Sequence, residues 1–110
     1  MPSQDLIRQI IAMYERHGWK LQRVLLRSET RAAIAAANEI FGGATLHEAD
    51  FDALWFARPS DGKREAWELR LISEQPYALF EAFEMDETEE DREAARHELE
   101  NRMRKYAETT

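Results

Sequence analysis

Hydrophobic residues recur every three or four positions near the start of the chain, a spacing typical of an amphipathic helix. The residues with this spacing are Leu6, Ile7, Ile10, Ile11 and Tyr14. Ser3 can cap the first turn, and Gly18 tolerates the left-handed conformation at which many helices end. The pattern therefore predicts a helix over Ser3–His17.

The next segments alternate between strand-like and helix-like composition. Trp19–Arg27 is rich in Val, Leu and Trp and too short for a helix, so it predicts a strand. Ser28 then begins an alanine-rich helix that we expect over Glu29–Phe41, and Gly42-Gly43 ends it. Ala44–Asp50 fits either a short edge strand or a loop.

Two further strands are expected over Ala53–Arg58 and Arg64–Ile72, with Asp61-Gly62 between them. This dipeptide is favoured at the centre of a type I′ hairpin turn. A turn centred there pairs Arg58 with Glu65, Phe56 with Trp67 and Leu54 with Leu69. A slip of one residue pairs Trp55 with Trp67 but sets Arg58 opposite Arg64. The first register is preferred, because like charges that face each other across strands are unfavourable.

The last third of the chain predicts one more strand and a long helix. The strand runs over Tyr77–Met85, and Thr88 then caps a helix that extends to about Ala107, with residues 108–110 frayed. The expected order is α-β-α-β-β-β-α. We therefore expect one α+β domain over residues 1–110, a mostly antiparallel sheet of about four strands with both terminal helices packed on one face.

The preferred register divides the hairpin residues between two faces of this sheet. The core face is expected to carry Leu54, Phe56, Trp67, Leu69 and Leu71, with Ala78, Phe80 and Ala82 from the next strand. The opposite face mixes aromatic and charged residues: Trp55, Glu68, Arg70, Ile72, Tyr77, Leu79, Glu81 and Phe83. A mixed face with large aromatics indicates partial cover, by the alanine-rich helix, by a second copy of the chain or by a ligand. The candidate interface or ligand residues are Trp55, Arg70, Tyr77 and Phe83.

Composition narrows the classes of function. The 110 residues include 15 Lys and Arg, 22 Asp and Glu and no Cys, for a net charge of −7. An acidic chain is a poor general binder of nucleic acid, and without Cys no disulfide framework or thiolate metal site can form. We expect no nucleic-acid partner, no membrane partner and a cytoplasmic location.

Acidic residues concentrate in one short stretch. Eight acids lie between Glu81 and Glu93, and those at the start of the last helix are explained by its dipole. The remaining acids form an acidic edge of Glu81, Glu84, Asp86 and Glu87. This edge is either a docking surface for a basic partner or a solvated strand end.

Few residues form a pattern that carries chemistry. His47, Glu48, Asp50 and Asp52 are weak metal candidates, and a solvated connection is the ordinary interpretation. Arginines 23, 27, 58 and 70 lie in expected strands and could converge on an anion or pair with neighbouring acids. No serine lies in Gly-x-Ser-x-Gly, and the four glycines build no phosphate-binding loop. We predict no catalytic residue, no cofactor and no metal.

These patterns favour a small protein-interaction domain without catalysis, which we expect to self-associate as a homodimer or to bind a protein partner. One alternative is a small-molecule or anion-binding protein, or an enzyme, that uses the sheet face around Trp55, Arg70 and Tyr77. A second alternative is a chaperone-like or inhibitor-like protein that docks a basic partner through residues 81–93.

Overall fold

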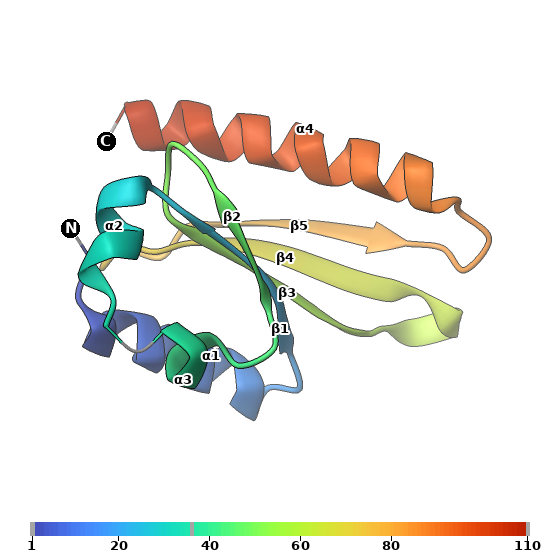
Figure 1. Cartoon of the computed structure of the whole chain (residues 1–110). Coiled ribbons are helices and arrows are strands. Elements are labelled where there is room, and N and C mark those ends of the chain that lie inside the picture. The colour runs from blue at the N-terminus through green and yellow to red at the C-terminus, as the bar shows by residue number, and fades with distance from the viewer. Residues whose placement is uncertain (1, 36, 110) are drawn as a thin grey trace.

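A mixed β-sheet lies between helices in the computed structural model, which describes residues 2–35 and 37–109 (Figure 1). Within that part of the chain the sheet has five strands in the order β2-β1-β3-β4-β5. The elements are α1 (Gln4–Arg16), β1 (Lys20–Leu26), α2 (Ser28–Ala33), α3 (Ala37–Phe41), β2 (Thr45–Glu48), β3 (Ala53–Pro59), the 3-10 turn η1 (Asp61–Lys63), β4 (Glu65–Leu71), β5 (Ala78–Phe83) and α4 (Glu89–Glu108).

The α+β class with helices at both ends is confirmed, but the sheet differs from the expectation in size and in direction. The ambiguous stretch Ala44–Asp50 contains an edge strand, β2, which pairs in parallel with β1. The other three pairings are antiparallel. A parallel neighbour requires a crossover connection, and α2 and α3 supply it between β1 and β2.

The predicted register between β3 and β4 is wrong by one residue. Ala57, not Phe56, lies opposite Trp67, and Leu54 lies opposite Arg70. The loop has three residues, Asp61–Lys63, instead of the two expected, and within it Gly62 and Lys63 have positive φ, at 66° and 68°. Ser60 N–H closes this loop by donating to the Arg64 carbonyl at 2.8 Å.

This shift of one residue redistributes the side chains between the two faces, because side chains alternate along a strand. The expected core face does not exist: Leu54 and Phe56 pack on the α1 side of the sheet, whereas Trp67, Leu69 and Leu71 pack on the other side. The opposite side also receives Trp55, Leu79 and Phe83. Phe80, expected in the core, is 56 % exposed.

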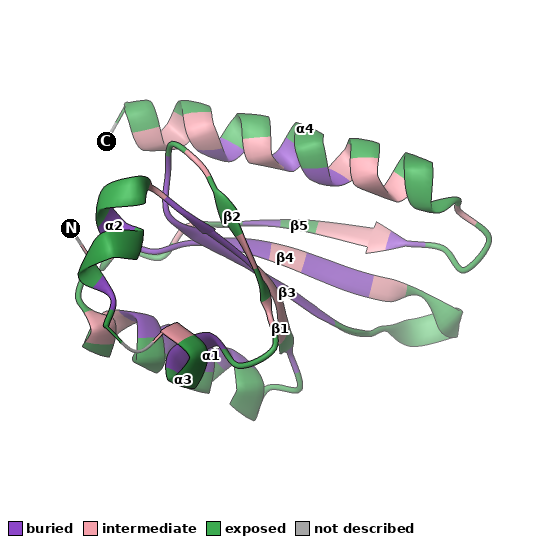
Figure 2. Ribbon diagram, in the orientation of Figure 1, coloured by how far each residue is buried: buried purple, intermediate pink, exposed green. Residues whose placement is uncertain are grey.

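The terminal helices pack on opposite faces of the sheet, which corrects the prediction that they share one (Figure 1). The helix α1 buries Ile7, Ile10, Ile11 and Tyr14, as its spacing predicted. The helix α4 buries Leu99 and Met103, together with Arg96. Figure 2 shows the buried residues concentrated in the central strands and on the inner sides of both helices. Both faces of the sheet are therefore covered over much of their area.

The alanine-rich helix is divided into α2 and α3, which corrects the single helix expected over Glu29–Phe41. Ile34 leaves the helical conformation, with φ −92° and ψ 111°, and its side chain is buried in the α1-side cluster. An extended backbone suits a β-branched residue, and Ile34 fills the core as a strand residue would. Residue 36 of the alanine run lies outside the described residues. Since α3 also packs on the α1 side, α4 and not this segment covers Trp55.

The helix ends agree with the expected capping. Leu6 N–H donates to Ser3 Oγ at 3.1 Å, and Asp91 N–H donates to Thr88 Oγ1 at 3.1 Å. The helix α4 extends to Glu108 with Thr109 as its C-cap, one residue beyond the predicted end. Residue 110, the last of the three residues expected to fray, lies outside the described residues. No helix in the described ranges is long and apolar enough to cross a membrane.

Candidate protein-interaction site

The edge strand β2 is short and open to solvent. Thr45, His47 and Glu48 are exposed, and Leu46 is half-buried. β1 is the strand that pairs with β2, and over residues 2–35 and 37–109 no strand pairs with the outer edge of β2. An unpaired edge strand presents N–H and C=O groups to which another polypeptide strand can bind.

The hydrogen bonds to β1 fix which backbone groups of β2 point outward. Ala49 N–H donates to the Leu26 carbonyl at 2.9 Å, so residue 49 points inward toward β1. Inward and outward groups alternate along a strand. Residues 45 and 47 therefore also point inward, and the N–H and C=O groups of Leu46 and Glu48 point away from the sheet.

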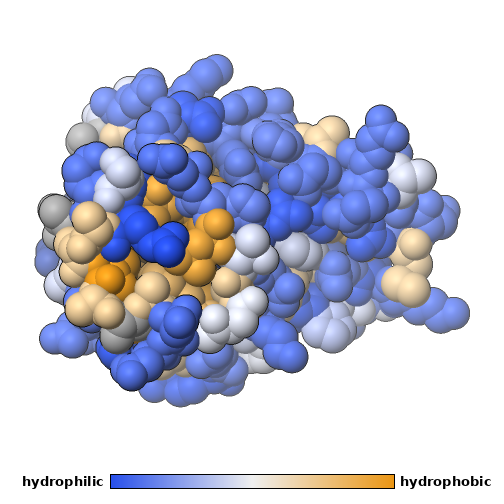
Figure 3. All heavy atoms as spheres, in the orientation of Figure 1, coloured by the Kyte–Doolittle hydropathy of each residue, from blue (hydrophilic) through white to orange (hydrophobic). Residues whose placement is uncertain are grey.

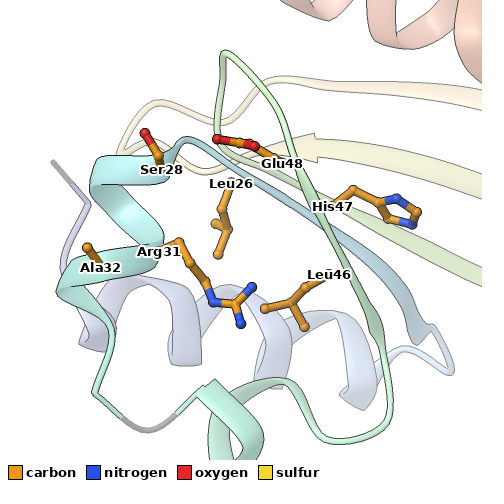
Figure 4. A pocket seen from close by; sticks show the side chains of 7 residues that line it. All are labelled: Leu26, Ser28, Arg31, Ala32, Leu46, His47 and Glu48. Carbon is orange, nitrogen blue, oxygen red and sulfur yellow. The ribbon is translucent and has the colours of Figure 1, made fainter.

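A pocket of ≈ 330 Å³ lies between β2 and α2, on the α1 side of the sheet (Figure 4). Its lining has apolar members, Leu26, Ala32 and Leu46, and polar members, Ser28, Arg31, His47 and Glu48. Figure 4 shows the Arg31 side chain extending from α2 into the pocket in the direction of Leu46, with Glu48 at the other end. Figure 3 shows apolar side chains gathered in a hollow over α2, α3 and β2, on a surface that is otherwise mainly hydrophilic.

Three of the four polar side chains that line this pocket have no partner in the described ranges, whereas the fourth, Ser28, donates from Oγ to Glu29 Oε1 at 2.8 Å. Arg31, His47 and Glu48 form no ion pair or side-chain hydrogen bond with any part of the chain that the structure describes. By contrast, the side chains of Arg23, Arg58 and Arg104 all have partners. The Arg31 guanidinium is exposed and can donate two parallel hydrogen bonds to a carboxylate.

A second, more polar groove of ≈ 460 Å³ lies between β2 and α4. Four of its charged side chains are already paired, since Arg23 binds Glu93 at 2.9 and 3.1 Å and Arg104 binds Asp50 at 2.8 and 3.0 Å. The hydrogen bond from Arg23, with a further one from Arg96, lowers the pKa of Glu93 to about 2 despite the opposing effect of burial. This groove therefore joins α4 to the sheet, and its paired charges are unavailable to a ligand.

The four predicted interface or ligand residues do not share a surface. Arg70 is 5 % exposed on the α1 side, and its guanidinium donates to the backbone carbonyls of Leu71 and Ser73. Trp55 is fully buried under α4 and donates its indole N–H to Glu100 at 2.8 Å. Phe83 is also buried on the α4 side, and Tyr77 stacks on Tyr106 with ring centroids 3.5 Å apart. The expected mixed face around Trp55 and Arg70 is therefore wrong, because the two side chains lie on opposite sides of the sheet.

The acidic edge is partly used within the chain. Glu84 lies 3.6 Å from Arg64, and Glu87 Oε1 accepts from Glu84 N–H at 2.9 Å. Glu81 and Asp86 have no ion pair or side-chain hydrogen bond in the described ranges. Phe80 and Met85 are exposed beside them, at 56 % and 68 %.

The weak metal candidates do not converge. Asp50 pairs with Arg104, whereas Asp52 is buried and accepts from Arg27 N–H and Thr30 Oγ1, both at 2.8 Å. His47 and Glu48 lie on β2. Among residues 2–35 and 37–109 no three His, Asp or Glu side chains are close enough together to hold a metal ion. Asp52 instead fixes the start of α2.

Sequence reasoning selected His47 and Glu48 but missed Arg31 and Leu46. Their role depends on β2 lying parallel to β1, which places α2 beside β2. The available signal was the possibility that Ala44–Asp50 forms an edge strand. Comparison of the chain with family models, with curated proteins and with solved structures found no match.

Proposed function

We propose that this chain is a small protein-interaction domain without catalysis, which binds an extended segment of a partner polypeptide along β2. The observation that carries the proposal is the open outer edge of β2, where Leu46 and Glu48 present outward backbone groups beside the Arg31 pocket. Strand addition takes its affinity from main-chain hydrogen bonds and its specificity from adjoining side-chain pockets. A cytoplasmic location is part of this proposal.

The other sheet edge, β5, supports a different kind of partner. Its acidic edge, with Glu81 and Asp86 unpaired in the described ranges and Phe80 and Met85 exposed, suits a basic segment with apolar residues. Docking of such a partner is the second candidate function. The β2 site is preferred because it combines an open edge with a pocket and an uncommitted arginine.

Selection of peptides from a phage-displayed random library tests the proposal. Selected peptides would be titrated against the wild type, Leu46→Pro and Leu46→Ala by fluorescence anisotropy. Proline removes the outward N–H of residue 46, and an edge strand tolerates it. We expect Leu46→Pro to weaken binding at least about tenfold and Leu46→Ala to weaken it less, since alanine keeps the N–H group.

Circular dichroism and thermal unfolding would establish that both variants fold. Peptides that bind wild type and Leu46→Pro equally would contradict binding at β2. If those peptides were also rich in Lys and Arg, the acidic edge would be the binding surface instead.

A further inference from the structure

We infer that the strand received by β2 is β2 of a second copy of this chain, paired antiparallel across a two-fold axis. The inference rests on the proposed function and names its partner. Its register sets Leu46 of one copy opposite Glu48 of the other. Backbone pairing and charge each support this choice.

The backbone argument follows from the outward groups of β2. Residues that point toward each other in an antiparallel pair exchange both N–H···O bonds. Pairing Leu46 with Glu48 of the second copy uses both outward residues of each strand, so the two-fold axis yields about four hydrogen bonds. A register centred on Leu46 would place Leu46 of the two copies opposite each other, and any further hydrogen-bonded pair would need Ala44. The Ala44 N–H already donates to the Phe41 carbonyl at 3.2 Å.

The charge argument follows from the same register. Leu46 and Glu48 are two residues apart, so their side chains lie on the same face, the side of the α2 pocket. Residues directly opposite each other in an antiparallel pair also share a face. Glu48 of the second copy would therefore lie beside Leu46, toward which Arg31 extends (Figure 4).

A two-fold axis repeats every contact, so Arg31 of each copy would meet Glu48 of the other. Both side chains are unpaired within the described part of one chain. The β2 surface is in this sense self-complementary in charge. The acidic edge beside β5 is not, because a second copy would bring like charges together. An interface built on four-residue strands is small, so we expect a weak dimer that depends on concentration.

Charge reversal tests the pairing, measured by sedimentation equilibrium of the full chain at concentrations up to about 1 mM. We expect the wild type to dimerise and Arg31→Glu and Glu48→Arg each to weaken dimerisation at least about tenfold. The double variant should regain dimerisation, because it exchanges the charges. An equal mixture of the two single variants should form mixed dimers, since each Arg31→Glu chain then faces a Glu48→Arg chain.

Arg8→Glu is the matched control. Arg8 is exposed on α1 and has no ion pair or side-chain hydrogen bond in the described ranges. Arg8→Glu therefore changes the net charge by as much as Arg31→Glu does, and it breaks no such contact. The inference would be overturned if Arg8→Glu weakened dimerisation as much as Arg31→Glu does. It would also be overturned if the wild type stayed monomeric. Dimers that persist in Leu46→Pro would overturn it too. A monomer that binds selected peptides through β2 would keep the proposed function while refuting the self-pairing.

Discussion

Arg96 projects from α4 toward the sheet and is 2 % exposed. Its guanidinium carbon lies 4.0 Å from the centroid of the Trp67 ring and 5.2 Å from that of Phe83. Its Nη1 also donates to Glu89 and Glu93, at 2.7 and 2.9 Å. The cation therefore packs as a core residue while its charge stays compensated, through cation–π contact and ion pairs.

The sequence could not reveal this role. Arg96 lies next to the apolar stripe of the last helix, and a hydrophobic pattern counts an arginine as part of the solvated face. The same holds for the hydrogen bond from Trp55 to Glu100, because these two residues lie 45 positions apart in the sequence. Pairing of buried polar groups depends on which elements meet in space.

Asp52 carries the clearest prediction at the scale of one residue. Its buried carboxylate accepts from Arg27 N–H and Thr30 Oγ1 at the start of α2. Asp52→Ala leaves the buried Thr30 hydroxyl and the part-buried Arg27 N–H without an acceptor, so we expect a loss of about 2 kcal/mol in the free energy of unfolding. Urea denaturation followed by circular dichroism measures this change.

Asp50→Ala is the control for Asp52→Ala, since it removes a nearby carboxylate whose ion pair with Arg104 is exposed. Such a pair contributes up to about 1 kcal/mol. Equal losses of stability in the two variants would show that the burial of Asp52 adds nothing to its contribution to stability.

At the scale of elements, the strand β3 explains why the register was mispredicted. Five consecutive residues, Ala53–Ala57, are buried because both faces of this central strand are covered. A continuous apolar run carries no alternation, so it fits every register equally well. The turn then decided the prediction, and the actual turn contains three residues, Asp61–Lys63, one more than expected.

Local signals predicted the elements better than their partners. The caps Ser3 and Thr88, the α1 spacing and the approximate strand limits were confirmed because they depend on neighbours in sequence. The parallel pairing of β2 and the break at Ile34 depend on contacts across the sheet. The candidate site was therefore predicted only in part. The sequence allowed an edge strand at β2, but it did not indicate that Arg31 lies beside that strand.

Gly42 supplies a prediction for the end of α3. Its φ is +58° and its N–H donates to the Asn38 carbonyl at 3.0 Å, so it ends the helix in a left-handed conformation. We expect Gly42→Ala to lower the free energy of unfolding by about 1 kcal/mol, because a Cβ is strained there.

Gly43→Ala provides the comparison for Gly42→Ala. Gly43 does not have positive φ, and no atom lies within 4 Å of a Cβ placed there. Its replacement should change stability by less than about 0.5 kcal/mol. Urea denaturation of both variants measures the difference, and equal effects would exclude backbone strain as the cause.

At the scale of the whole molecule, charged residues attach the α4 layer to the sheet. Arg23 of β1 binds Glu93, Arg104 binds Asp50, and Arg92 lies 3.6 Å from Glu65 of β4. The buried apolar part of α4 is narrow, with Leu99 and Met103 at its centre. The layer should therefore respond to acid more than the α1 layer, whose buried residues are aliphatic and aromatic.

Glu93→Gln tests this dependence on acid. The hydrogen bonds from Arg23 and Arg96 hold the pKa of Glu93 near 2, below the ordinary 4.5. Glu93 is therefore harder to protonate in the folded state than in the unfolded state. Its contribution to the free energy of unfolding is present above pH 4.5 and is lost as the pH falls toward 2. We expect Glu93→Gln to be less stable by about 1 kcal/mol at pH 7, a figure reduced for partial exposure.

The difference between wild type and Glu93→Gln should shrink as pH falls from 4.5 to 2, as measured by thermal unfolding across that range. Glu98→Gln is the control, because Glu98 is exposed on α4 and unpaired in the described part of the chain. A difference in stability that stays the same at every pH would show that Glu93 does not contribute to the response to acid.

The three tryptophans are distributed unequally between the two layers. Trp19 packs in the α1-side cluster, whereas Trp55 and Trp67 pack under α4. Intrinsic fluorescence of the intact chain is therefore weighted toward the α4 layer. A chain whose only indole is at position 19 would emit from the α1 layer, so the two halves of the molecule carry separate optical reporters without any added label.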